Sequence, residues 1–111
     1  MIKPLLQVAL DHTDLQSALV SAELLAPEVD VLEAGTILCY SEGLRAVEAL
    51  RKKYRKHIIL ADLKVADAGA VVAQQVFNLG ATWMTVICNA PLATMEAALK
   101  VARDKDGDIQ V

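Results

Sequence analysis

Short apolar segments alternate with amphipathic segments along the whole chain, and this alternation limits its possible folds more than any other feature. Five apolar runs, at residues 5–10, 29–33, 57–62, 82–88 and 108–111, predict strands. Between these runs, apolar residues recur at spacings of three and four, which predicts helices. Strands that alternate with helices form a parallel sheet with right-handed crossovers. The sequence therefore predicts a single α/β domain over residues 1–111.

Capping and helix-breaking residues set the predicted helix boundaries. Thr13 or Asp14 can cap the first helix and Ser41 the second, whereas Gly80 ends the third and Pro91 opens the fourth. The resulting pattern fits either an open doubly wound sheet or the first half of an eight-stranded β/α barrel.

A half barrel would have an apolar inner face, which in the whole barrel packs against the other four strands. The candidates for this face are Val8, Leu10, Val31, Ile59 and Val86.

The composition excludes several classes of protein. The 111 residues carry a formal net charge of −3, which supplies no basic field for a nucleic acid, and the only dense basic run is residues 51–56. No apolar stretch approaches the roughly 20 residues of a membrane span, and the first residues lack a signal-peptide core. Cys39 and Cys88 are too few for a disulfide framework and are expected to be reduced. We therefore expect a cytoplasmic protein with no nucleic-acid or membrane partner.

Charged side chains stand where three successive predicted strands end. Asp11 follows the first strand, Glu33 ends the second, and Asp62 ends the third, with Lys64 two residues further on. The carboxyl ends of parallel strands open on one face, where ligands bind. Because residues i and i+2 of a strand project to the same side, Asp62 and Lys64 are expected to point together into the ligand space.

This group of side chains suits a reaction in which negative charge develops on the substrate. A lysine among carboxylates stays protonated and can stabilise an anion or deliver a proton. Glu33 and Asp62 could hold a hard divalent cation such as Mg²⁺. For Asp62 and Lys64, the alternative is a solvated ion pair at the mouth of a loop.

Four segments of the chain together resemble a known enzyme family. They are residues 6–11 (LQVALD), 33–39 (EAGTILC), 61–69 (ADLKVADAG) and 83–88 (WMTVIC). These segments are similar to those of the 3-keto-L-gulonate 6-phosphate decarboxylases, Mg²⁺-dependent members of the orotidine 5′-monophosphate decarboxylase superfamily. The resemblance implies a (β/α)8 TIM-type barrel, of which residues 1–111 would be the N-terminal half, from the first strand to the fifth.

The resemblance also implies a role for each charged residue of the site. Glu33 and Asp62 match the acids that bind Mg²⁺ and substrate, and Asp11 matches an acid that contacts substrate. Lys64 matches the catalytic lysine facing the enediolate that remains after CO₂ leaves. Asp67 matches a catalytic acid that reaches across a homodimer interface to the partner's lysine. The implied reaction converts the sugar phosphate 3-keto-L-gulonate 6-phosphate to L-xylulose 5-phosphate, a step of ascorbate catabolism.

Other residues that the family uses match nothing in this chain, because they belong to the second half of the barrel. They are a histidine, an arginine and the phosphate-binding loops, so the chain alone is expected to be inactive. His12 and His57 do not replace them and are expected to be structural. Three other interpretations remain: a hexulose-6-phosphate synthase, which is an aldol lyase, a non-catalytic fragment, and a receiver-like doubly wound domain.

Overall fold

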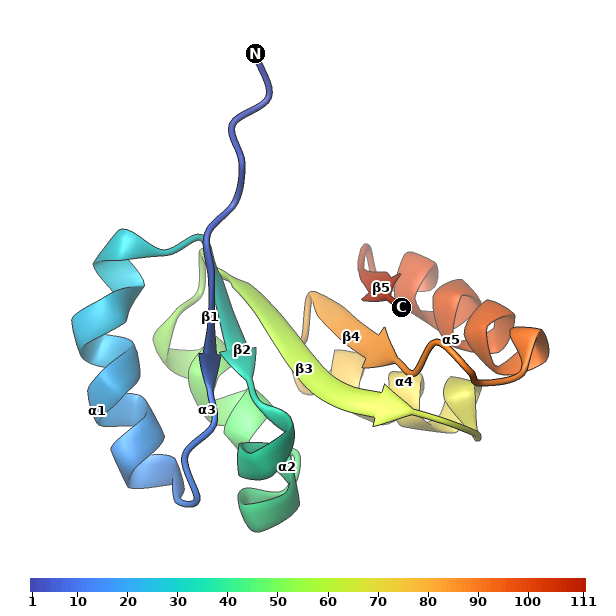
Figure 1. The fold of residues 1–111 in the computed structure, drawn as a ribbon, viewed down its shortest axis with the longest axis horizontal. Helices are drawn as coiled ribbons and strands as arrows, with labels where there is room; N and C mark the ends of the chain where they lie inside the picture. The colour runs from blue at the N-terminus through green and yellow to red at the C-terminus, as the bar shows by residue number, and fades with distance from the viewer.

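The sheet has five parallel strands in the order in which they occur along the chain. A computed structural model describes all 111 residues. The strands are β1 (Gln7–Leu10), β2 (Val31–Ala34), β3 (Ile58–Val65), β4 (Trp83–Val86) and β5 (Asp108–Gln110). Each strand pairs only with its neighbours in sequence, so β1 and β5 are the two edges (Figure 1). A doubly wound sheet reverses its strand order at a switch point, whereas a β/α barrel keeps sequential order. The doubly wound, receiver-like interpretation is therefore wrong.

Helices connect the strands and cover one face of the sheet. They are α1 (Leu15–Leu25), the 3-10 helix η1 (Ala26–Glu28), α2 (Thr36–Glu42), α3 (Arg45–Lys53), α4 (Gly69–Asn78) and α5 (Leu92–Asp104). The carboxylate of Asp14 caps α1 as predicted, because it accepts a hydrogen bond from the Ser17 N–H at 2.8 Å. Gly80 follows α4 with a φ of 103°, which suits the predicted helix end. None of these helices combines the length and the hydropathy needed to cross a membrane.

Two predicted boundaries are wrong. Ser41 does not cap a helix but lies inside α2, and Gly43, with a φ of 67°, separates α2 from α3. The pattern missed α2 because its seven residues make only two turns directly after a strand. Asp62 does not end the third strand, since β3 continues to Val65.

The side chains on the two faces of the sheet are not distributed as predicted. Val8, Leu10, Ile59 and Val86 face the helices, where they belong to or contact the buried apolar cluster. Of the five residues predicted for the inner face, only Val31 lies there, because its register and alternation place it on the face away from the helices. Both faces of these strands are rich in apolar residues, so periodicity could not tell them apart.

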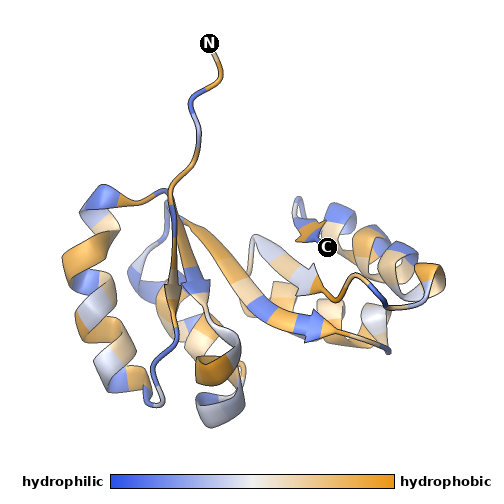
Figure 2. Ribbon diagram, viewed as in Figure 1, coloured by the Kyte–Doolittle hydropathy of each residue, from blue (hydrophilic) through white to orange (hydrophobic).

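The regular pairing of β3 with β4 is interrupted near the carboxyl end of the sheet. Ala61 pairs with Met84 and Val65 pairs with Val86, so residues 62–64 of β3 stand opposite a single residue of β4, Thr85. This bulge changes the direction of the strand and of its side chains. Figure 2 shows hydrophilic residues on this part of β3, after a hydrophobic stretch.

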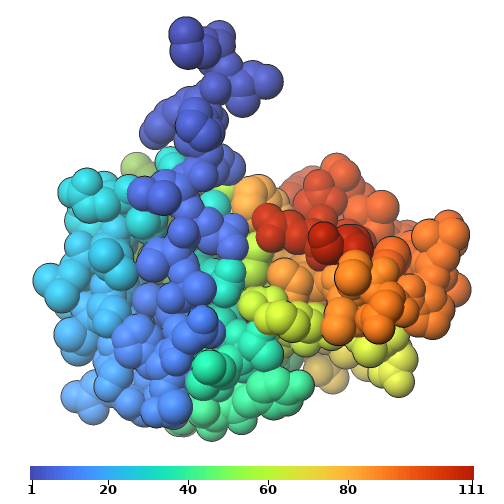
Figure 3. All heavy atoms as spheres, in the orientation of Figure 1, coloured from blue at the N-terminus to red at the C-terminus, as the bar shows by residue number.

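The amino-terminal residues project away from the rest of the molecule (Figure 3). The segment joins the sheet at Leu6, whose N–H donates a hydrogen bond to Asp30 Oδ2 at 2.8 Å. Leu5 and Leu6 are more than half exposed, so the edge at β1 is open to another strand.

Candidate active site

The candidate site is a hollow at the carboxyl ends of β3, β4 and β5. Its volume is about 360 Å³, and Asp62, Lys64, Thr85, Cys88 and Gln110 are among its lining residues. The carboxyl ends of parallel strands are the usual place for an active site in β/α folds. Of the predicted site residues, Asp62 and Lys64 line this hollow, whereas Asp11 and Glu33 do not.

Asp62 and Lys64 form a close ion pair in this hollow. Lys64 Nζ lies 2.6 Å from Asp62 Oδ2, which confirms that the two side chains point together. The reason differs from the one expected, because Lys64 does not follow regular strand geometry. It lies in the β3 bulge with a φ of 48°, which is unusual for a residue other than glycine. The strained backbone turns the lysine toward Asp62.

Two threonines complete the contacts of this pair. The Thr85 hydroxyl donates a hydrogen bond to Asp62 Oδ1 at 2.7 Å. The Thr36 hydroxyl lies 2.8 Å from Asp62 Oδ2 and accepts a hydrogen bond from Lys64 Nζ at 2.5 Å. Both carboxylate oxygens of Asp62 are therefore held by donors from neighbouring elements.

These contacts keep both members of the pair charged. Burial by itself would raise the pKa of Asp62, but hydrogen bonds from Lys64, Thr85 and Thr36 outweigh it and lower the pKa. The hydrogen bond to Asp62 raises the pKa of Lys64, and the charges of Asp62, Glu33 and Asp11 act in the same direction. The site therefore presents a protonated lysine whose side chain is about half exposed to solvent.

Glu33 is the one charged side chain in the buried interior, with 8% of its surface exposed. Gln7, on the neighbouring strand β1, donates a hydrogen bond from Nε2 to Glu33 Oε1 at 2.7 Å. Burial raises the pKa of Glu33, the hydrogen bond from Gln7 opposes this shift, and the negative charges of Asp62 and Asp11 add to it. Glu33 therefore lies near two other negative charges, and a bound cation would reduce the repulsion among the three carboxylates.

Asp11 follows β1 and lies against the start of α2. Its Oδ1 is so close to Gly35 that a Cβ atom at position 35 would overlap it. A glycine at position 35 is therefore needed for Asp11 to reach this place beside Glu33.

Asp67 is not brought into the site within one chain. It is exposed in the turn between β3 and α4 and forms no hydrogen bond or ion pair. The remaining predicted residues, Asp11, Glu33, Asp62 and Lys64, influence one another's charge at the carboxyl ends of β1, β2 and β3.

Sequence reasoning missed three polar residues that support this group: Gln7, Thr36 and Thr85. Gln7 and Thr85 lie on the same face of the sheet as Glu33, by strand alternation and register. Marking every polar residue on that face would have found Gln7 and Thr85. Thr36 lies on α2, the helix that the pattern missed.

Comparison with known proteins defines the family of this chain. Residues 4–111 match the orotidine 5′-phosphate decarboxylase / HUMPS family. The chain belongs to this family. It is 55% identical over 111 residues to the 3-keto-L-gulonate-6-phosphate decarboxylase SgbH of Escherichia coli K12, a match that covers all of this chain and 50% of SgbH.

Solved structures of the family have the same fold. A structure of KGPDC from Streptococcus mutans in complex with a sugar phosphate matches with a TM-score of 0.94 and 48% identity, covering 97% of this chain and 51% of that one. A 3-hexulose-6-phosphate synthase from Salmonella typhimurium matches with a TM-score of 0.93 but only 31% identity, covering 96% of this chain and 50% of that one. The chain thus spans about half the length of the relatives it matches, and its five strands correspond to the first half of the barrel.

The oxygen ligands of the site fit the Mg²⁺ ion that the resemblance implies. No three His, Cys, Asp or Glu side chains are arranged to enclose a metal ion. Mg²⁺ does not need such a cage, because it keeps several waters and commonly takes only one or two carboxylates with substrate oxygens. Glu33 and Asp62 can supply these two carboxylates, and Glu33 Oε2 forms no hydrogen bond within the protein.

The histidines and Cys39 take no part in this chemistry, whereas Cys88 lines the hollow. His57 Nε2 contacts the Ala26 carbonyl oxygen at 2.8 Å and His12 Nε2 contacts Ser21 Oγ at 2.9 Å, both in structural positions as expected. Burial raises the pKa of the Cys39 thiol to about 11, so this thiol is unreactive at neutral pH. Cys88 is exposed, and both cysteines are free, as expected.

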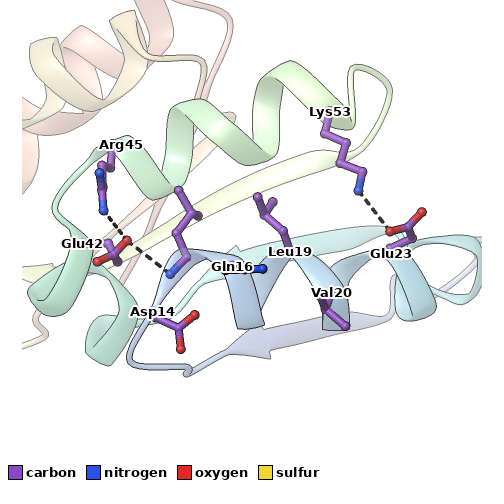
Figure 4. A pocket seen from close by; sticks show the side chains of 9 residues that line it. Asp14, Gln16, Leu19, Val20, Glu23, Glu42, Arg45 and Lys53 are labelled. Carbon is purple, nitrogen blue, oxygen red and sulfur yellow. Dashed lines mark hydrogen bonds and ion pairs between the residues drawn. The ribbon is translucent and has the colours of Figure 1, made fainter.

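A larger groove lies on the outside of the fold, between α1 and the α2–α3 region (Figure 4). Its volume is about 610 Å³. Its cations are neutralised, because Arg45 pairs with Glu42 at 2.6 Å and Lys53 pairs with Glu23 at 3.3 Å. None of the predicted site residues lines it, so we assign the chemistry to the smaller hollow at the strand ends.

Proposed function

We propose that this chain supplies the N-terminal half of an active site that decarboxylates 3-keto-L-gulonate 6-phosphate to L-xylulose 5-phosphate and CO₂. The observation that carries the proposal is the Lys64 ammonium held 2.6 Å from Asp62 at the carboxyl end of the sheet. The 55% identity to E. coli SgbH supports this substrate, and the ligand-bound structure of the S. mutans relative supports a sugar phosphate.

The reaction needs a fixed positive charge beside a carbonyl oxygen. The bond between the carboxylate carbon C1 and C2 breaks, CO₂ leaves, and the electron pair moves toward the C3 ketone to form an enediolate. A proton then adds to C2. Lys64 stabilises the negative charge that develops on the C3 oxygen, and Asp62 keeps the lysine protonated. Asp11 accepts hydrogen bonds from substrate hydroxyl groups at the end of β1.

Mg²⁺ would be held by Glu33 and Asp62, and when bound it supplies a second positive charge for the same oxygen-rich substrate. The chain's own residues prepare this position. Gln7 fixes Glu33, and the two threonines fix Asp62.

We also propose a homodimer in which Asp67 of one subunit reaches Lys64 of the other. The exposure of Asp67 and its lack of a partner within the chain support this arrangement. A cytoplasmic location goes with the proposed substrate, because a charged sugar phosphate does not cross a bilayer unaided.

The experiment measures catalysis by the chain alone and by the chain joined to the half of SgbH that it does not match. We expect the joined protein to release CO₂ from 3-keto-L-gulonate 6-phosphate in the presence of Mg²⁺ and the chain alone to be inactive. Condensation of formaldehyde with a pentulose phosphate, without CO₂ release, would instead identify a hexulose-6-phosphate synthase. Absence of both reactions in a folded joined protein would overturn the proposal.

The dimer has its own test, in which inactive Lys64→Ala and Asp67→Asn variants of the joined protein are mixed after dissociation. If the sites are shared, each mixed dimer contains one intact site, and random pairing restores about a quarter of wild-type activity. If each site belongs to a single subunit, mixing restores nothing.

A further inference from the structure

Thr85 lies where the pairing of β3 with β4 leaves a backbone N–H of β3 without a backbone acceptor. Three residues of β3, 62–64, stand opposite Thr85 alone, so the ladder of backbone hydrogen bonds is interrupted there. On the far side of the bulge the ladder resumes, with the Ile87 N–H bonded to the Val65 carbonyl at 3.0 Å. The Lys64 N–H, inside the bulge, donates to the Thr85 hydroxyl at 2.8 Å. A side chain therefore replaces the missing backbone acceptor.

The same hydroxyl also contacts the carboxylate of the site. It has one proton, which it donates to Asp62 Oδ1 at 2.7 Å, and its lone pair accepts the Lys64 N–H. Thr85 thus joins the backbone of the lysine to the side chain of the aspartate. Its own backbone lies in β4, a strand held by β3 and β5 on its two sides.

We propose that Thr85 is a positioning residue: its hydroxyl holds the 62–64 bulge in the shape that presents Asp62 and Lys64 to the substrate. This inference rests on the proposed decarboxylation. Lys64 needs such support because its φ of 48° is costly for a lysine and its side chain is half exposed. Without the hydroxyl, the bulge can relax and the ammonium moves away from the position it must occupy.

Thr82 offers a matched control three residues earlier in the chain, just before β4. Its hydroxyl accepts hydrogen bonds from the Ile59 N–H at 3.1 Å and from Arg51 at 2.7 Å, at the opposite end of the sheet. Thr82→Val and Thr85→Val each remove one hydroxyl with little change of shape. Only the second change touches the bulge.

The kinetic test compares the two valine variants and Thr85→Ser in the protein joined to the second half of SgbH. We expect Thr85→Val to lower kcat by about 10²-fold with little change in KM, because a shift of about 1 Å at the reacting groups has an effect of this size. Thr85→Ser, which keeps the hydroxyl, should restore most of the rate, and Thr82→Val should leave kcat per folded molecule unchanged. Equal loss in Thr85→Val and Thr85→Ser, or a loss below threefold in Thr85→Val, would overturn the proposal.

A second measurement does not depend on catalysis. Amide hydrogen exchange of Lys64 in the chain should be at least tenfold faster in Thr85→Val than in wild type and Thr85→Ser, whereas the Ile59 amide should respond only to Thr82→Val. Unchanged Lys64 exchange in Thr85→Val would show that the hydroxyl does not hold the bulge. If wild type itself is inactive, the proposed function fails, and this measurement still decides whether Thr85 fixes Lys64.

Discussion

The two ends of the sheet each hold a cation, but they hold it in opposite ways. At the amino-terminal end, Arg51 donates to the carbonyl oxygens of Gly80, Tyr54, Arg55 and His57 and to the Thr82 hydroxyl, at distances of 2.7–3.2 Å. All of its bonds go to neutral groups. At the carboxyl end, Lys64 faces carboxylates and is half exposed. The arginine joins loops together, whereas the lysine remains available to a ligand.

The physical consequences differ accordingly. Burial lowers the pKa of Arg51, which nevertheless remains charged, and each nitrogen of its guanidinium group donates a hydrogen bond within the fold. Lys64 keeps hydrogen-bonding capacity for substrate, because an ammonium has three donors and only Asp62 and Thr36 occupy them. We infer that Arg51, at the amino-terminal end of the sheet, mainly stabilises the fold, whereas Lys64, at the carboxyl end, is available for chemistry. The predictions below test that separation.

The largest expected effect is on turnover, at the carboxyl end. Lys64→Ala in the joined protein should lower kcat by about 10³-fold, because a preorganised donor to a developing oxyanion is worth about 10²–10³ and this one is also charged. The free energy of unfolding should change by less than about 1 kcal/mol, because the pair is partly exposed. Steady-state kinetics and urea denaturation measure the two quantities. A loss of turnover below tenfold would reduce Lys64 to a solvated partner of Asp62.

The next effect concerns the proposed Mg²⁺ site. Glu33→Gln and Asp62→Asn should each weaken Mg²⁺ binding and lower kcat by at least about 10²-fold in the joined protein, since a neutral amide replaces one of the two carboxylates that we propose as ligands. Calorimetric titration with MgCl₂ and circular dichroism separate lost binding from lost folding. Unchanged Mg²⁺ affinity in either variant would remove that residue from the metal site.

At the amino-terminal end, the expected effect is on stability alone. Arg51→Leu should lower the free energy of unfolding by about 3 kcal/mol, because it leaves several carbonyl oxygens without their charged donor. The rate per folded molecule should stay the same. Lys52→Ala is the control: Lys52 pairs only with Glu48, at 2.9 Å on the surface, so its loss should change stability by less than about 0.5 kcal/mol. Equal effects of the two substitutions would mean that the Arg51 network contributes little.

The smallest effect is a pH dependence at Glu33. Its pKa is raised in the folded protein, mainly by burial, so its contribution to stability is fully present below the unfolded-state pKa and is lost as pH rises through the folded pKa. Glu33→Gln should therefore raise the free energy of unfolding at pH 7 relative to wild type in the absence of metal. The difference should disappear below about pH 4, where the carboxyl group is protonated in both states. Urea denaturation at both pH values checks it, and a less stable variant at pH 7 would contradict it.

The acidic residues could be found from the sequence because topology alone determines where strand ends meet. In a parallel sheet, Asp11, Glu33 and Asp62 come close to the same end of the strands, and the register shows this because Leu10, Ala34 and Ala61 stand side by side. The family could be recognised for the same reason, since its segments surround those strand ends. The strand order followed from that resemblance, and the structure confirms it.

The remaining features depend on relations between strands, which one strand's sequence does not show. The bulge is a mismatch of three residues against one, so neither β3 nor β4 alone predicts it or the role of Thr85. The predicted face of Val8 and Leu10 is wrong, because apolar residues predominate on both faces of these strands and the prediction made no use of Gln7, which alternates with them and lies on the other face with Glu33. Asp67 has no contact in the chain that could test its predicted role, which involves a second subunit.

The contact between Asp11 and Gly35 makes the site vulnerable to a very small change. A methyl group at position 35 would occupy the place of the Asp11 carboxylate and would also press on the Leu10 carbonyl oxygen, 2.9 Å away. Asp11 lies at the surface after β1 and can turn outward, so most of the core would be kept. In a mutagenesis library of the joined protein, Gly35→Ala would therefore fall among the variants that accumulate normally in cells yet fail to support growth on the proposed substrate. A screen that scores only protein yield would class it as neutral.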